Sequence, residues 1–175
     1  MDKLDIVTDE SGNKVVLLPE IIFSNKQNIN WDDVEDYLGK YVGELIEIAE
    51  TRDIIYIGNK FPDEYGGSSY TRKTKRARAK AKANAAQGIR EMVEIATDKV
   101  YRENHKEKHS EDAHNGWFYY VTRFAIPLYD NEKKTGEYNV YSACLVVNHA
   151  ANGKMYLYDV VDIKKEASNP LKTIK

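Results

Sequence analysis

The chain has 175 residues, 42% of them hydrophobic, and a formal net charge of -2. That length predicts one domain with a real hydrophobic core, and the negative net charge excludes a uniformly basic protein that coats nucleic acid. The only cysteine, Cys144, excludes an internal disulfide and a thiolate metal cluster within one chain. The amino terminus lacks an apolar signal region, and no apolar run is long enough to span a bilayer. We therefore expect a soluble, cytoplasmic protein or a domain of a larger one, without a membrane partner.

The first half of the chain predicts two hairpins and one helix between them. Residues 5–19 hold two apolar runs on either side of a Glu-Ser-Gly-Asn turn, which is typical of a hairpin. Asn30 precedes a run with apolar residues at helical spacing, so we expect an amphipathic helix from Trp31 to about Gly43. Residues 45–50 and 54–58 then form a second hairpin around Thr51-Arg52-Asp53.

The middle of the chain predicts a loop followed by helices. Pro62 and Gly66-Gly67 break regular structure, so residues 59–70 are expected to be loop. Residues 72–82 read RKTKRARAKAK, and because alanine favours helix we expect one helix from there to Gly88. In that helix, Ala77, Ala81 and Ala85 would pack on the body and the basic side chains would form two outward ridges. A short helix around Met92 follows.

The last part predicts a polar loop over residues 100–116 and then strands. Residues 117–128 form a strand with Phe118, Tyr120, Phe124 and Ile126 on its more apolar face, and residues 129–137 form a loop. Asn152-Gly153 predicts a two-residue hairpin turn. Counting from that turn pairs His149 with Tyr156, Val147 with Tyr158, Tyr141 with Lys164, Val146 with Asp159, Cys144 with Val161 and Ser142 with Ile163.

These elements predict the α+β fold class, as a single domain with helices packed on a twisted antiparallel sheet. We divide it into an N-terminal hairpin region (residues 1–28), a main body (residues 29–170) and a tail (residues 171–175).

The basic stretch is the strongest functional signal. It carries seven basic residues and no acidic one within eleven positions, which leaves a net charge of -9 for the rest of the chain (-2 minus 7). Such a run is often only a solvated surface. Mutual repulsion instead favours an external anion, nucleic acid first and an acidic protein surface second. The candidate binding residues are Arg72, Lys73, Lys75, Arg76, Arg78, Lys80 and Lys82.

A second group of residues has the chemistry for metal-free RNA cleavage. That reaction needs a base, cations at the scissile phosphate and an acid, and His109, Lys108, Arg123, Tyr141 and Tyr158 are the right types. Each has a plainer interpretation: His109 as a surface histidine, Arg123 as the partner of an acid such as Asp159 or Asp162, and the tyrosines as half-buried core. We expect no cofactor, and no metal at His105 and His109, because Lys106 stands where a metalloprotease needs Glu.

Three runs, KAKANAAQGIREMVEIA, KHSEDAHNGWFYYVTRFAIPLYD and YNVYSACLVVNHAANGKMYLYDVVDIKKEASNP, support a resemblance. With these runs in this order, the chain resembles domains of phage and mobile-element polyvalent proteins. Those domains are grouped with the barnase, EndoU, colicin E5/D and RelE-like nucleases, and the resemblance covers about Glu20 to Pro170. The resemblance implies helices against an antiparallel sheet and an RNase-type site on the exposed sheet face, at Lys108, His109, Arg123 and the hairpin tyrosines.

Two functions follow as hypotheses. The first is a metal-independent endoribonuclease domain that prefers RNA to DNA. The second is a non-catalytic, anti-CRISPR-like inhibitor that binds nucleic acid or a host nucleoprotein through the basic helix.

Overall fold

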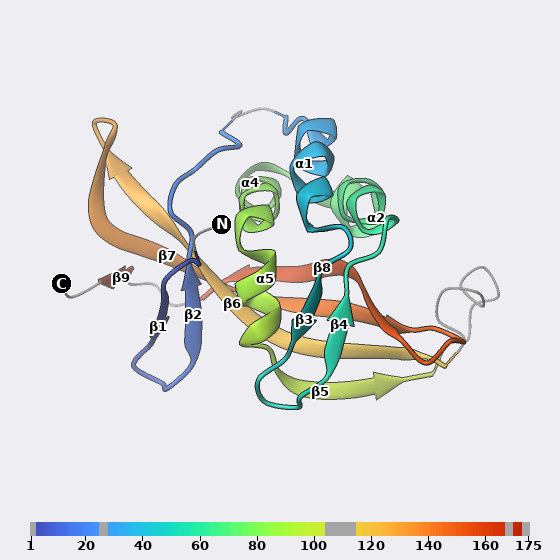
Figure 1. Cartoon of the computed structure of the whole chain (residues 1–175). Coiled ribbons are helices and arrows are strands. Elements are labelled where there is room, and N and C mark those ends of the chain that lie inside the picture. The colour runs from blue at the N-terminus through green and yellow to red at the C-terminus, as the bar shows by residue number, and fades with distance from the viewer. Residues whose placement is uncertain (1–2, 25–27, 104–114, 167–169, 173–175) are drawn as a thin grey trace.

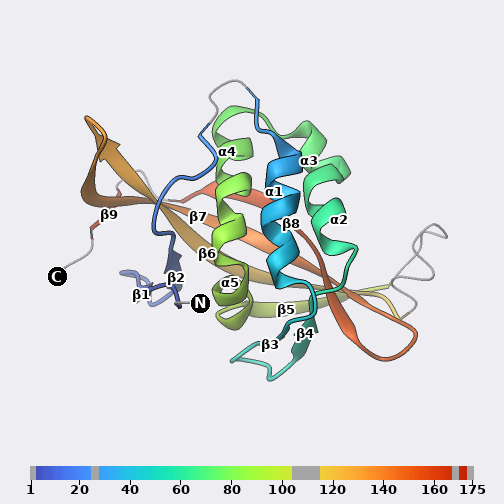
Figure 2. The same ribbon diagram turned by 45° about the horizontal axis from the view of Figure 1, so that its top comes forward.

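The fold is mixed α+β, with helices covering one face of a curled sheet (Figure 1). A computed structural model describes residues 3–24, 28–103, 115–166 and 170–172. Figure 2 shows the helices lying side by side above the long central strands. The main core lies between these two layers and includes Phe124, Leu145 and Val160, which are all fully buried.

Three long antiparallel strands form the centre of the sheet: β6 (Trp117–Asp130), β7 (Lys133–His149) and β8 (Met155–Lys165). The order is β1-β2-β6-β7-β8-β4-β3, with β5 on β6 and β9 on β7. The other strands are β1 (Ile6–Thr8), β2 (Lys14–Leu17), β3 (Leu45–Glu47), β4 (Ile54–Tyr56), β5 (Thr97–Arg102) and β9 (Leu171–Lys172).

The sheet is mixed, so the predicted antiparallel sheet is wrong in this respect. Both early hairpins were predicted correctly, and β1–β2 and β3–β4 are antiparallel pairs. Each hairpin then joins the sheet through its second strand, which runs parallel to β6 in one case and to β8 in the other. A hairpin pattern fixes the pairing inside the hairpin but not the direction of the strand against which it docks.

The β7–β8 register agrees with the prediction only in its middle. Val146 faces Asp159 and Cys144 faces Val161, as counted. His149 instead faces Met155 and Tyr141 faces Lys165, because register shifts lie on both sides of the correct segment. The turn is also wider than two residues, since the N–H of Ala150 donates to the carbonyl of Lys154 at 3.0 Å.

The helices begin with α1 (Trp31–Leu38), which continues as a 3₁₀ turn to Tyr41 and confirms the first helix prediction. Asn30 caps it, because its side-chain oxygen accepts from the N–H of Asp32 at 3.1 Å. The loop predicted at residues 59–70 is wrong. It contains α2 (Phe61–Gly67) and the start of α3 (Ser69–Lys73). Pro62 fits because the first helical turn needs no N–H donor there.

The remaining helices are α4 (Arg76–Ala85), a 3₁₀ turn (Ala86–Gly88) and α5 (Ile89–Glu94). Two predicted loops are partly strand. Residues 97–102 form β5, and most of residues 129–137 belong to the β6–β7 hairpin. That hairpin turns at Asn131 and Glu132, which both have positive φ, the conformation that a two-residue type I′ turn requires.

Candidate nucleic-acid interface

The basic stretch forms two helices rather than the single one predicted. Thr74 and Lys75 have extended backbone and Arg76 has φ of 53°, so α3 ends before α4 begins. The hydroxyl of Thr74 donates to the carbonyl of Thr71 at 2.7 Å and closes the end of α3. The break gives the cations on the two helices different directions.

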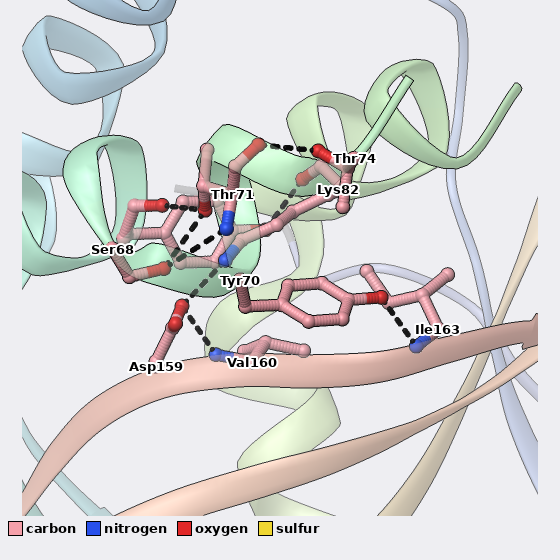
Figure 3. Close-up of polar contacts among 9 residues, drawn as sticks. Ser68, Tyr70, Thr71, Thr74, Lys82, Asp159, Val160 and Ile163 are labelled. Atoms are coloured by element: carbon pink, nitrogen blue, oxygen red, sulfur yellow. Dashed lines mark hydrogen bonds and ion pairs between the residues drawn. The ribbon is translucent and has the colours of Figure 1, made fainter. Parts of the chain in front are cut away.

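Lys82 is buried, and its predicted outward position is wrong. Its Nζ lies 2.5 Å from Oδ1 of Asp159, and its side chain is 0% exposed (Figure 3). The Nζ also lies 4.5 Å from the ring centroid of Tyr65 and 5.1 Å from that of Tyr70. Burial lowers the pKa of Lys82 and raises that of Asp159, because both groups lose water.

Small side chains explain why a lysine can lie so deep. The four alanines from Ala79 to Ala85 at alternate positions are all buried, on both sides of α4. Helix α4 is therefore enclosed at its C-terminal half by the rest of the fold. Ala77 lies one turn before Ala81 and is exposed. The predicted packing face of Ala77, Ala81 and Ala85 is therefore confirmed only for its last two members.

The other six cations form what we call the basic surface. Arg72, Lys73, Lys75, Arg76 and Arg78 are exposed and Lys80 is partly exposed. The ion pairs found among the described residues include none of these six side chains. Six positive charges on α3, on α4 and between them are thus exposed or partly exposed, and none forms an ion pair among the described residues.

Arg123 is neutralised within the fold. Its Nε donates to Oε1 of Glu166 at 2.6 Å. The interpretation that Arg123 pairs with an acid is confirmed, but the acid is Glu166, just after β8, and not Asp159 or Asp162. Asp159 pairs with Lys82 instead. An arginine already paired with a carboxylate is a poor phosphate ligand.

Tyr141 and Tyr158 contribute to different clusters. Tyr141 is 8% exposed and stacks on Phe124 in the main core, with ring centroids 5.4 Å apart. Burial raises its pKa. Tyr158 packs edge-on against Trp117, at 5.0 Å, in a separate small cluster. The plainer interpretation, half-buried core, thus holds for Tyr141.

The described members of the proposed catalytic set do not converge. Arg123 is opposite Ser142 on β7, whereas Tyr158 lies beside the pairing of Val146 with Asp159. Four residues along a strand separate these positions by roughly 13 Å. Lys108 and His109, with His105, lie outside the described residues, so their roles stay predictions.

The described ranges contain neither a metal-binding cluster nor a membrane-spanning helix. No group of three or more His, Cys, Asp or Glu side chains there could hold a metal ion. No helix in the same ranges is long and apolar enough to cross a membrane.

A cavity of about 280 Å³ is a feature that the sequence did not predict. Its lining residues come from the connection between β4 and α2, from α2 itself, from the end of β7 and from the start of β8. Its walls include Asn59, Phe61, Glu64, Asn148, Tyr156 and Tyr158. The one available signal was Asn148, an amide that interrupts the apolar end of a predicted strand.

Comparisons with protein-family models, with curated proteins and with solved structures give no match for this chain. The geometry of the residues is therefore the basis for any functional proposal.

Proposed function

We propose that this protein binds the phosphate backbone of nucleic acid through the basic surface. The observation that supports the proposal is the set of six solvent-facing cations without described ion-pair partners, in a chain of net charge -2. Like charges held close together repel one another, and a polyanion relieves that repulsion while releasing its own counterions. RNA is the expected partner in preference to DNA, as the resemblance to RNase-like domains implies.

The break between α3 and α4 favours an extended partner. Because the backbone leaves helical geometry between α3 and α4, the cations do not form one straight ridge, and a flexible strand of phosphates can follow such an arrangement. An acidic protein surface, such as that of a host nucleoprotein, is the alternative partner. It would have to match this particular arrangement, whereas a flexible strand of phosphates adapts to it.

Binding without catalysis agrees best with the residues described. Arg123 is paired and Tyr141 is buried, so two of the five proposed catalytic residues have structural roles. The proposed setting is the cytoplasm, in a mobile element or phage, with an inhibitor as the proposed role. RNA cleavage remains the second hypothesis and depends on Lys108 and His109.

Salt-dependent binding tests the proposal. A labelled single-stranded RNA and a DNA of the same sequence are titrated at several salt concentrations, with fluorescence anisotropy as the readout. The variant Lys73→Gln, Arg76→Gln, Lys80→Gln removes three charges from the basic surface. It should weaken binding and reduce the slope of log K against log salt by about 2 to 3, since each phosphate contact contributes roughly 0.7 to 0.9.

A matched control removes the same charge elsewhere. Lys14, Lys133 and Lys134 are exposed and lie on β2 and at the tip of the β6–β7 hairpin, and their change to Gln should leave the slope unaltered. Equal slopes for the wild type and the basic-surface variant would overturn the proposal. Failure of every oligonucleotide to bind would leave the acidic protein as the partner to pursue.

The same samples separate binding from cleavage. RNA incubated in EDTA with wild-type protein should stay intact. Cleavage that is lost in His109→Ala would instead establish the endoribonuclease.

A further inference from the structure

The cavity beside β7 and β8 contains an unsatisfied polar group. Asn148 is 8% exposed, and its side-chain oxygen is buried without a hydrogen-bond partner among the described residues. Buried polar atoms in folded proteins nearly always have a partner. Asn148 also lines the cavity, but its oxygen has almost no accessible surface, so the amide has to turn toward the cavity before a molecule bound there can supply the missing hydrogen bond.

The walls of the cavity are aromatic and held in place. The ring of Tyr156 lies 5.7 Å from that of Tyr56, and its hydroxyl accepts from Nδ2 of Asn152 at 3.3 Å. Gly58 lies against the same ring, since a Cβ at that position would be 3.4 Å from it. Phe61 and Tyr158 complete the aromatic lining. At about 280 Å³ the cavity has room for one small ring system and is too small for a duplex.

We propose that this cavity binds one unpaired nucleobase of the nucleic acid held by the basic surface, a proposal that rests on the function proposed above. An asparagine amide presents one acceptor and one donor side by side, which matches the edge of a base such as adenine. Aromatic walls suit the faces of any base. The Glu64 carboxylate, also in the lining, accepts from an exocyclic amino group and so favours adenine, cytosine or guanine over uracil.

Strand β8 links the cavity to the residue just before the basic stretch. The hydroxyl of Tyr70, two residues before Arg72, accepts from the N–H of Ile163, and Tyr158 lies five residues earlier on β8. Five residues of strand span roughly 17 Å. A single strand of a few nucleotides covers a distance of that order.

Amide signals of the isotope-labelled protein provide a direct test. The side-chain NH₂ signal of Asn148 is identified by its absence in Asn148→Leu, and adenosine, cytidine, guanosine and uridine monophosphates are titrated one at a time. At least one nucleotide with an amino-bearing base should shift that signal, and uridine monophosphate should shift it least. If none of the four shifts it, the base-binding proposal is wrong.

Single-base RNA oligomers of eight nucleotides then separate the two proposals. Asn148→Leu should weaken the preferred oligomer about tenfold and leave the salt slope unchanged, because it removes a base contact rather than a phosphate contact. Asn139→Leu, on β7 outside the cavity, is the control and should have no effect. If Asn148→Leu does not fold, Asn148→Asp keeps the size of the side chain and removes the NH₂ donor.

The outcomes are distinguishable. Oligomers that bind with a normal salt slope but without any effect of Asn148 would overturn the cavity proposal and keep the proposed function. A nucleotide that shifts the Asn148 signal while no oligomer binds would support the cavity as a base site and overturn backbone binding.

Discussion

Lys80 and Lys82 are two residues apart in one helix, yet they lie in opposite environments. Lys80 is partly exposed and belongs to a surface of six cations without described ion-pair partners. Lys82 is fully buried between two tyrosine rings and paired with Asp159. The alternation of alanine with lysine is the same at both positions. What differs is the side of α4 on which each side chain lies, because residues two apart point in nearly opposite directions around a helix. Lys82 therefore points toward the sheet and pairs with Asp159, whereas Lys80 points toward solvent.

The largest expected effect comes from removing the internal partner. Asp159→Asn leaves the ammonium of Lys82 buried without a counter-charge, and breaking a buried pair in this way costs about 3–5 kcal/mol of the free energy of unfolding. Urea denaturation measures it. Lys80→Gln, the matched change two residues away, should cost less than about 0.5 kcal/mol.

A double variant shows whether the pair acts through its charges. Lys82→Met with Asp159→Leu replaces both ions with apolar groups and should recover most of the lost stability, since such replacements are often neutral or stabilising. A double variant as unstable as Asp159→Asn would contradict this account.

Much of the fold could be predicted because it depends on local patterns. The early hairpins, the Asn30 cap and the apolar face of β6 follow from alternation, turn residues and helical spacing. The burial of Lys82 and the pairing of Arg123 with Glu166 depend on contacts between residues 77 and 43 positions apart, which no local pattern contains. Helix α2 was missed because Pro62 and Gly66 are residues that usually interrupt helices. Here Pro62 lies in the first turn, and close packing explains Gly66. A Cβ on Gly66 would lie 2.6 Å from the side chain of Glu35 on α1.

For the candidate site, the sequence predicted which basic residues are exposed, but it did not predict how the surrounding residues are arranged in space. Five of the seven basic residues are exposed as expected, because charged side chains need water unless they are paired. The cavity was not predicted, since it is formed by three segments distant in the chain. The role proposed for Asn148 depends on a missing hydrogen bond, which a sequence does not show.

A smaller effect tests how the basic surface is held on the sheet. The Tyr70 hydroxyl accepts from the Ile163 N–H at 2.9 Å, just before the first basic residue. Tyr70→Phe keeps the ring near Lys82 but leaves that N–H without its partner, which should cost about 1 kcal/mol in urea denaturation. Tyr129→Phe, an exposed tyrosine on β6, is the control. No loss of stability in Tyr70→Phe would show that this bond does not help to hold α3.

The smallest effect concerns two neighbouring carboxylates, which repel each other as the cations of the basic surface do. Glu35 on α1 lies beside Asp63 on α2, and burial together with that carboxyl raises the pKa of Glu35 from 4.5 to about 7. Between these pH values the folded state binds more protons than the unfolded state, so this group makes stability fall as pH rises. Glu35 is partly exposed, and the contribution should therefore stay below about 1 kcal/mol.

Glu35→Gln tests this account because the amide stays neutral at every pH. The difference in melting temperature between the variant and the wild type should be small at pH 4.5 and should grow in favour of the variant up to about pH 8. Glu10→Gln, in the turn between β1 and β2, should give a constant difference over the same range. A constant difference for Glu35→Gln as well would mean that Glu35 and Asp63 do not share a proton. The repulsion between them would then be relieved by water, which is also the plainer interpretation of the six cations of the basic surface.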